Sequence, residues 1–381
     1  MAVSLSICMI SDDFLPAMTG VGTHLKLIAP ELVRRGHRVS IITSRRKGEA
    51  ALEHWEGVTI YRLFTIKVYG FYLALPSQSA VRAILNIVKP DIVHHHYVGF
   101  MMRQVCAVAE SLNLPQVSTF HISAEILTAP LTLRPLRGLA QRMIVHFNNR
   151  FDLVIAPSQN LAKQITSEGI RTPVRFITNP VVFGDSTNVV PADRTPDFTV
   201  LNAGRLAPEK NVVYLLKAFA ALQKDVPGSV LWVAGTGPEY PALKSWCDQL
   251  GITGQVKFLG FLDHPTLARY YAACDVFVSP SLMETQGLVV MEAMWFSRPV
   301  IVTSAIVSAT ELVANAVNGY IVDPDVVDDL TKRLVTLVRD PKIRSEMGIA
   351  SRLRADAYRP EPVVDALEAS YRDVLQQRAH G

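Results

Sequence analysis

The sequence contains little cysteine and little charge. Only four cysteines occur in 381 residues, at positions 8, 106, 247 and 274, and no two of them form a Cys-x-x-Cys pair. This scatter excludes a disulfide framework and a cysteine zinc site, and it predicts small buried thiols in a reducing compartment. Charged residues make up 19% and hydrophobic residues 49%, a balance that excludes a disordered chain.

The sequence also lacks a long apolar run. No stretch approaches the roughly 18 consecutive apolar residues of a membrane-spanning helix. The amino terminus has no basic region ahead of its first short apolar run, so we expect no signal peptide. These absences predict a protein that is soluble or attached to a membrane from one side.

Strand and helix patterns alternate along both halves of the chain. A stretch without periodicity, 184–197, separates them, so we predict domains at 1–184 and 198–358 and a terminal segment at 359–381 with a helix over 362–377. The alternation predicts an α/β fold in which helices cover both faces of parallel sheets. The expected strands are 5–10, 39–43, 58–62, 92–95, 116–120, 153–157 and 174–178, then 199–203, 229–234, 256–259, 276–279, 300–303 and 320–322.

Two carboxylates, Glu284 and Glu292, lie eight positions apart where a predicted strand gives way to a predicted helix. Gly287 lets a ligand approach the backbone closely. The amides of Leu288 and Val289 would be free at the helix start, with the positive end of the helix dipole behind them. An anion fits there, with a carboxylate on each side to accept hydroxyl hydrogen bonds, as a nucleotide sugar requires. The alternative is an ordinary strand–loop–helix unit with two solvated acids.

A second predicted strand runs into Gly204 and a loop that contains Arg205 and Lys210. Ligands collect at the carboxyl ends of strands in open α/β sheets, so the two cations can neutralise a diphosphate there. A third strand ends at Gly235 in the sequence Val-Ala-Gly-Thr-Gly-Pro-Glu. Taken alone, each loop also fits an ordinary surface turn.

These three segments, in this order, resemble the family four retaining glycosyltransferases. The resemblance rests on Gly-Arg-x-x-Pro-Glu-Lys at 204–210, the glycine turn at 233–239 and the paired glutamates at 284–292. It implies the GT-B fold, in which two Rossmann-like doubly wound domains face each other across a cleft that contains the active site. The domain 1–184 would bind the acceptor and 198–358 the nucleotide sugar, and the terminal helix of 359–381 would cross back to the first domain.

The resemblance also implies roles for particular residues. A loop at 14–24 matches the family loop that closes on the donor phosphates, although the usual glycine pair is here Thr19-Gly20. The loop at 307–311 lacks the glycines and proline of the family pattern. The implied catalytic residues are His121, Glu284, Arg205 and Lys210. The implied donor-binding residues are Gly20, Gly204, Arg205, Lys210, Gly235, Glu284, Gly287, Leu288, Val289 and Glu292.

Histidine is the remaining chemically informative residue type. His121 follows a predicted strand, and in relatives a histidine at this point contacts the transferred sugar; the alternative is a buried structural histidine. The run His94-His95-His96 lies at another strand end, where alternation places His94 and His96 on one face and His95 on the other. No carboxylate or cysteine follows at ligand spacing, so we expect no metal site. We interpret the Asp-Pro-Asp sequence at 323–325 as a turn.

Charge is divided unequally between the two halves. Residues 1–180 hold 19 basic and 11 acidic residues, and residues 181–381 hold 19 and 23. A basic first half indicates an anionic partner. Basic and apolar residues also mix in 60–75 and 132–150, a pattern that suits an acidic bilayer surface. No nucleic-acid motif accompanies the charge, so we expect no nucleic-acid partner. The basic and apolar segments instead predict a cytoplasmic location at the inner face of the plasma membrane.

The predicted function is transfer of a hexose from a nucleotide diphosphate sugar to a hydroxyl of a membrane lipid, with retained anomeric configuration. The sequence Glu-Thr-Gln-Gly-Leu at 284–288 is similar to that of bacterial diacylglycerol glucosyltransferases, which favours UDP-glucose as donor. GDP-mannose or another UDP-sugar remains open, with phosphoinositide, capsule or lipopolysaccharide acceptors. A nucleotide-sugar epimerase and a non-catalytic binding protein on the same scaffold are further alternatives.

Overall fold

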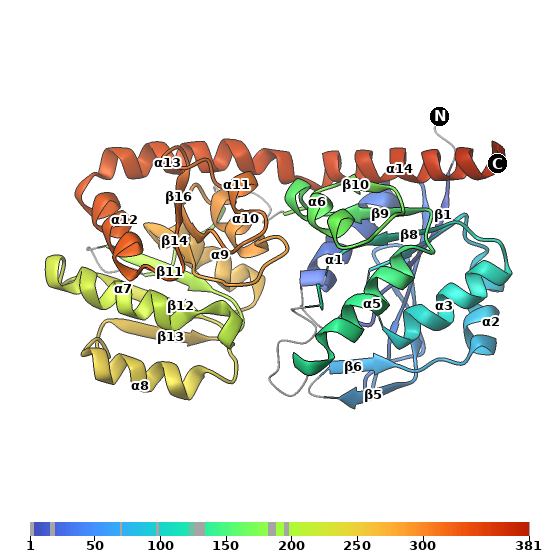
Figure 1. The fold of residues 1–381 in the computed structure, drawn as a ribbon, viewed down its shortest axis with the longest axis horizontal. Coiled ribbons are helices and arrows are strands. Elements are labelled where there is room, and N and C mark those ends of the chain that lie inside the picture. The colour runs from blue at the N-terminus through green and yellow to red at the C-terminus, as the bar shows by residue number, and fades with distance from the viewer. Residues whose placement is uncertain are drawn as a thin grey trace. The chain divides into compact units, whose positions relative to one another are not determined.

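The computed structural model describes residues 4–15, 20–68, 71–96, 99–121, 123–124, 134–181, 188–193 and 198–380. The chain forms two compact units. Unit 1 comprises Met1–Pro180 together with Pro360–Gly381, and unit 2 comprises Val181–Arg359. Both units are α/β (Figure 1), so the predicted fold class is confirmed.

Unit 1 contains a mostly parallel sheet and a separate hairpin. Its described strands are β1 (Ser6–Ile10), β2 (Arg38–Ser44), β3 (Leu52–Trp55), β4 (Val58–Leu63), β5 (Thr65–Val68), β6 (Phe71–Ala74), β7 (Ile92–His95), β8 (Gln116–Thr119), β9 (Leu153–Ala156) and β10 (Val174–Phe176). Eight of them pair in the order β10-β9-β8-β7-β1-β2-β4-β3, all parallel except β3 against β4. The antiparallel β5–β6 pair forms the hairpin. The strand order reverses direction between β1 and β7, which makes this the switch point of the sheet.

Helices connect the parallel strands of unit 1. They are α1 (Gly20–Arg34), α2 (Gln78–Val88), α3 (Phe100–Ser111), α5 (Arg137–Asn148) and α6 (Gln159–Ser167). A terminal helix, α14 (Pro360–His380), also belongs to this unit. Ser77 and Ser158 cap the starts of α2 and α6, because their hydroxyls accept hydrogen bonds from the amides of Ala80 and Leu161. The terminal helix α14, red in Figure 1, packs against α1 within this unit and contributes apolar residues to its core.

Unit 2 is built on one parallel sheet. Its described strands are β11 (Thr199–Ala203), β12 (Val230–Ala234), β13 (Val256–Gly260), β14 (Val276–Ser279), β15 (Val300–Thr303) and β16 (Gly319–Val322), in the order β13-β12-β11-β14-β15-β16. Its helices are α7 (Val212–Asp225), α8 (Tyr240–Leu250), α9 (His264–Ala273), α10 (Leu288–Trp295), α11 (Ala309–Leu312), α12 (Val327–Arg339) and α13 (Pro341–Ala355).

Both faces of the unit 2 sheet are buried. Along β14, Val276 and Val278 join one apolar cluster, whereas Phe277 between them joins the other. Neighbours in β11 alternate in the same way, with Val200 in the first cluster and Leu201 in the second. This double burial explains why the strands appear in the sequence as continuous apolar runs.

All thirteen strands expected from the sequence are present, within two residues at each end. The structure adds β3, β5 and β6, which the sequence pattern did not predict. β3 is an edge strand with mostly exposed side chains, so burial leaves no pattern in its sequence. The four cysteines are free and buried, as expected. Among the described residues, no helix combines the length and apolarity needed to cross a membrane.

Candidate active site

The predicted donor-binding loops meet at the switch point of unit 2. The central strands β11 and β14 are parallel neighbours, although β12 and β13 lie between them in the sequence. The loops that follow β11 and β14 therefore leave the sheet side by side at its carboxyl edge, where doubly wound folds bind ligands. The Leu282 amide, after β14, donates to the Glu209 carbonyl, after β11, at 2.8 Å.

Glycine makes the close packing of these loops possible. Gly204 has φ +149°, and Gly235, after β12, has φ +132°. A Cβ atom at Gly235 would lie 1.8 Å from the Gly204 carbonyl oxygen, and one at Gly237 would lie 2.1 Å from that of Leu206. No described atom lies within 4 Å of a Cβ atom built at Gly204. The glycines of the β12 loop are therefore required because no side chain fits between the loops. Glycine is required at position 204 because other residues rarely adopt its positive φ.

The two predicted cations each contact a carboxylate. Lys210 Nζ lies 2.5 Å from Glu284 Oε1, an ion pair that joins the loops after β11 and β14. Arg205 Nη2 lies 2.5 Å from Glu209 Oε1 within a single loop, and its side chain is 54% exposed. The sequence pattern placed Lys210 and Glu284 at the same edge but did not predict their pairing. Each cation is thus already paired with a carboxylate. An anion that binds here must share the cation with that carboxylate or displace it.

The start of α10 differs in one detail from the prediction. The Leu288 amide donates to the Gln286 carbonyl at 3.0 Å and is not free. Gly287 between them has φ −75° and ψ 82°, close to an inverse γ-turn, so its conformation does not depend on the special freedom of glycine. The Val289 amide has no hydrogen-bond partner among the described residues, so it is the amide here that can donate to an anion.

Glu292 lies on α10 and is buried. Tyr271, on α9, donates its hydroxyl proton to Glu292 Oε2 at 2.8 Å, and His264 Nε2 lies 4.0 Å from Oε1. Burial raises the pKa of Glu292 to about 7, and the hydrogen bond from Tyr271 opposes that rise. Tyr271 was not among the predicted site residues, because nothing in the spacing of two separate helices shows that the side chains meet.

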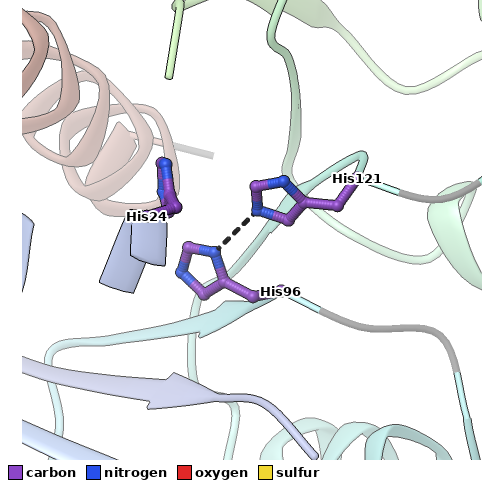
Figure 2. Close-up of side chains that lie close together, drawn as sticks. All are labelled: His24, His96 and His121. Carbon is purple, nitrogen blue, oxygen red and sulfur yellow. Dashed lines mark hydrogen bonds between the residues drawn. The ribbon is translucent and has the colours of Figure 1, made fainter. Parts of the chain in front are cut away.

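The predicted site residues of unit 1 lie near its own switch point. His121 follows β8, and Gly20 begins α1 and is exposed. Of the loop 14–24, residues 16–19 lie outside the described part of the chain. Figure 2 shows His121 beside His96 and His24, and His96 Nδ1 lies 3.2 Å from His121 Nε2. Burial lowers the pKa of His121 to about 4, so its ring is neutral near pH 7.

The histidine run separates as predicted. The rings of His94 and His96 lie together with centroids 4.0 Å apart, whereas His95 stacks on Phe151. The group of three histidines in Figure 2 was not predicted. Ligand spacing in a sequence shows only residues that lie close together along the chain, whereas His24, on α1, is distant in sequence from His96 and His121.

The sequence also predicted specific features for two loops near the end of unit 2. The Asp325 amide donates to the Asp323 carboxylate at 2.9 Å, which confirms a plain aspartate turn. The loop after β15, which lacks the family glycines, still reaches the site, because the Val307 amide donates to the Glu284 carbonyl at 3.1 Å.

Both units match known families. A model described as Glycosyltransferase Family 4 matches residues 18–183, and one described as Glycosyl transferases group 1 matches residues 188–354. An alpha-monoglucosyldiacylglycerol synthase of Acholeplasma laidlawii is 26% identical over 96% of both chains. A GDP-mannose-dependent alpha-mannosyltransferase of Mycolicibacterium smegmatis is 28% identical over 98% of this chain and 99% of its own. A D-inositol 3-phosphate glycosyltransferase of Mycobacterium avium is 30% identical over 75% of this chain and 70% of its own.

Solved structures share the fold. A sucrose-phosphate synthase from Thermosynechococcus elongatus superposes with a TM-score of 0.82 at 20% identity, covering 97% of this chain and 99% of its own. Anabaena HepE in complex with UDP-glucose gives a TM-score of 0.78 at 20% identity, covering 97% and 100%. The chain therefore belongs to the retaining glycosyltransferases of family 4, with the GT-B fold, and is a hexosyltransferase.

Proposed function

We propose that this enzyme transfers glucose from UDP-glucose to a hydroxyl of a membrane lipid. The observation that carries the proposal is the Lys210–Glu284 pair at the switch point of unit 2, in the loops that follow β11 and β14, with the buried Glu292 on α10, the helix that comes next. Full-length similarity to a glucosyldiacylglycerol synthase supports a glucosyl donor and a diacylglycerol-type acceptor.

The donor would bind unit 2 through groups with distinct tasks. The cations Lys210 and Arg205 and the Val289 amide would hold the diphosphate, and Glu292 would accept hydrogen bonds from the ribose hydroxyls. Glu284 would accept hydrogen bonds from the sugar. When the bond from the anomeric carbon to the phosphate oxygen breaks, the electron pair remains on UDP. Charge developing there is stabilised by donors and cations already in place.

Retention would follow from a front-face substitution. Glu284 is held by Lys210 at 2.5 Å, a partner that fixes its carboxylate in place, so in this proposal Glu284 orients the sugar rather than attacks it. The acceptor hydroxyl would approach from the side that UDP leaves and pass its proton to the phosphate oxygen that departs. His121 belongs to unit 1, and its contact with the sugar stays a prediction.

A basic, partly apolar face of α5 supports an acidic membrane surface as the site of reaction. Leu139 and Met143 on α5, and Leu136 directly before it, are exposed at the spacing of one helical face, and Arg142 is exposed beside them. Exposed apolar side chains with neighbouring cations fit the headgroup boundary of an anionic bilayer. Phe64, 71% exposed, is a further apolar residue available in this unit, outside α5.

The deciding experiment combines the purified chain with UDP-glucose and vesicles that contain diacylglycerol and an anionic phospholipid. We expect UDP release that depends on the lipid and a glucolipid product with the anomeric configuration of the donor. Release of UDP without acceptor would favour an epimerase or hydrolase, and an inverted product would contradict the front-face mechanism. GDP-mannose in the same assay tests the mannosyl alternative, which the mannosyltransferase relative keeps open.

The membrane surface has its own test. Leu139→Asp should reduce sedimentation of the chain with anionic vesicles, because it places a carboxylate on the proposed bilayer face. Leu353→Asp is a matched control, since Leu353 on α13 is 69% exposed against 66% for Leu139. Equal vesicle binding by both variants would contradict a role for α5.

A further inference from the structure

Three imidazoles from distant parts of unit 1 converge on one point. His24 projects from α1, and His96 and His121 follow β7 and β8 (Figure 2). One ring nitrogen of each lies within 4.8 Å of the ligand nitrogens of the other two. His24 and His96 are almost fully buried, and His121 is partly buried.

The sheet order explains this convergence. β7 lies between β1 and β8, and α1 follows β1, so the carboxyl ends of three neighbouring segments meet at one edge. The His96 amide donates to the Ile10 carbonyl at 2.8 Å, which fixes the end of β7 against β1. The backbone therefore holds His96 and His121 in place, and α1 presents His24 to them.

Two of the three rings, those of His24 and His96, have buried nitrogens whose hydrogen bonding is incomplete among the described residues. Among the described residues, neither ring nitrogen of His24 has a hydrogen-bond partner, and neither does His96 Nε2. The side chain of Asn179 is a polar neighbour of the His24 ring. A buried nitrogen without a hydrogen-bond partner destabilises the fold by its lost hydration, unless a bound ion or molecule takes the place of that partner.

We propose that His24, His96 and His121 bind a single divalent transition-metal ion, with Zn²⁺ as the preferred occupant. Neutral imidazole is a ligand of choice for zinc, and three protein ligands leave the fourth tetrahedral position open. Two imidazole nitrogens at about 2.0–2.1 Å from a tetrahedral zinc ion lie about 3.3 Å apart. His96 Nδ1 and His121 Nε2 are 3.2 Å apart and already span such an edge.

Binding needs two local changes. The proton shared between His96 and His121 moves to an outer nitrogen of the same ring, so that both facing lone pairs reach the ion. The ring of His24 turns so that one of its nitrogens points at the ion. His94 takes no part, because its two ring nitrogens already bond Tyr371 and Thr119, each at 2.7 Å. It packs against His96 and supports that ring.

The site has a consequence that rests on the proposed function. If His121 contacts the transferred sugar, a metal ion bound to it withdraws that imidazole from the donor. Zn²⁺ should then inhibit transfer, and a chelator should restore activity. Metal binding itself requires neither donor nor acceptor, so the two ideas can fail separately.

The test uses the untagged full chain, because a polyhistidine tag would itself bind metal. After treatment with a chelator, equilibrium dialysis against Zn²⁺ measures the bound ion, and Co²⁺ absorption in the visible range reports tetrahedral nitrogen ligation. We expect one ion per chain. Loss of a supporting partner alone costs roughly 10–100-fold in metal affinity, so His24→Gln and His121→Gln should each lose at least that much.

His95→Gln is the matched control, since His95 is equally buried in the same run but faces Phe151. Circular dichroism and thermal unfolding verify that each variant is folded. If His24→Gln does not fold, His121→Gln, at the least buried of the three positions, still tests the proposal. The proposal is overturned if the wild-type chain binds no stoichiometric Zn²⁺, or if both ligand variants bind as His95→Gln does. Stoichiometric binding without inhibition would support the metal site and contradict the sugar contact of His121.

Discussion

Replacement of Lys210 by methionine tests the electrostatic basis of donor binding. The substitution keeps most of the side-chain volume and removes the charge that lies 2.5 Å from Glu284. Two unit charges 4 Å apart interact by about 4 kcal/mol at an effective dielectric constant of about 20. Because the lysine side chain remains 23% exposed, solvent screens part of this. We expect a net loss of about 1–2 kcal/mol in UDP binding, a five- to thirty-fold weaker affinity.

Turnover should fall further than affinity, because charge on the leaving phosphate increases in the transition state. Removal of one group that stabilises a developing oxyanion costs about 100- to 1,000-fold in turnover, which is the loss expected for Lys210→Met. Glu284→Gln should have the opposite effect on nucleotide binding. It releases Lys210 from its carboxylate partner, so UDP affinity should stay level or rise while transfer is lost.

Isothermal titration with UDP and initial-rate kinetics with the full donor measure the two effects. Lys224→Met is a suitable control, since Lys224 is an exposed lysine in the last turn of α7, the helix that follows Lys210. If Lys210→Met binds UDP and turns over like the control, the assignment of this loop to the diphosphate is wrong. Equal weakening of UDP by Lys210→Met and Glu284→Gln would refute the idea that the carboxylate competes with the phosphate.

Three further outcomes are expected. Gly235→Ala should abolish UDP binding and lower the unfolding temperature, because its methyl group would collide with the neighbouring loop, whereas Gly254→Ala, where nothing lies within 4 Å, should leave both unchanged. UDP affinity should fall on acidification through about pH 7, because Glu292 is protonated there. Tyr271→Phe should move that transition to higher pH, because it removes a hydrogen bond that lowers the pKa of Glu292. An unchanged pH profile in Tyr271→Phe would contradict this coupling. His121→Ala should reduce the transfer rate at unchanged UDP affinity, and equal loss of both would place the residue at the nucleotide instead.

Local sequence information was sufficient for the elements that carry the site. A strand such as β14 is buried on both faces, so it appears as an uninterrupted apolar run bounded by a proline. In parallel α/β units the functional loop directly follows the strand, so the order of residues along the chain already places Glu284 and Lys210 after strand ends. Edge strand β3 escaped prediction because exposed side chains leave no periodic signal.

The sequence by itself determined the two α/β units and the loops at the carboxyl ends of their strands, because backbone periodicity and glycine positions are local properties. Only the tertiary structure decided which side chains meet. Lys210 pairs with Glu284 across 74 residues, and His24 meets His121, because strand order brings distant segments to one sheet edge. The state of charge was also decided there, since burial sets the pKa of Glu292 and keeps the histidines neutral.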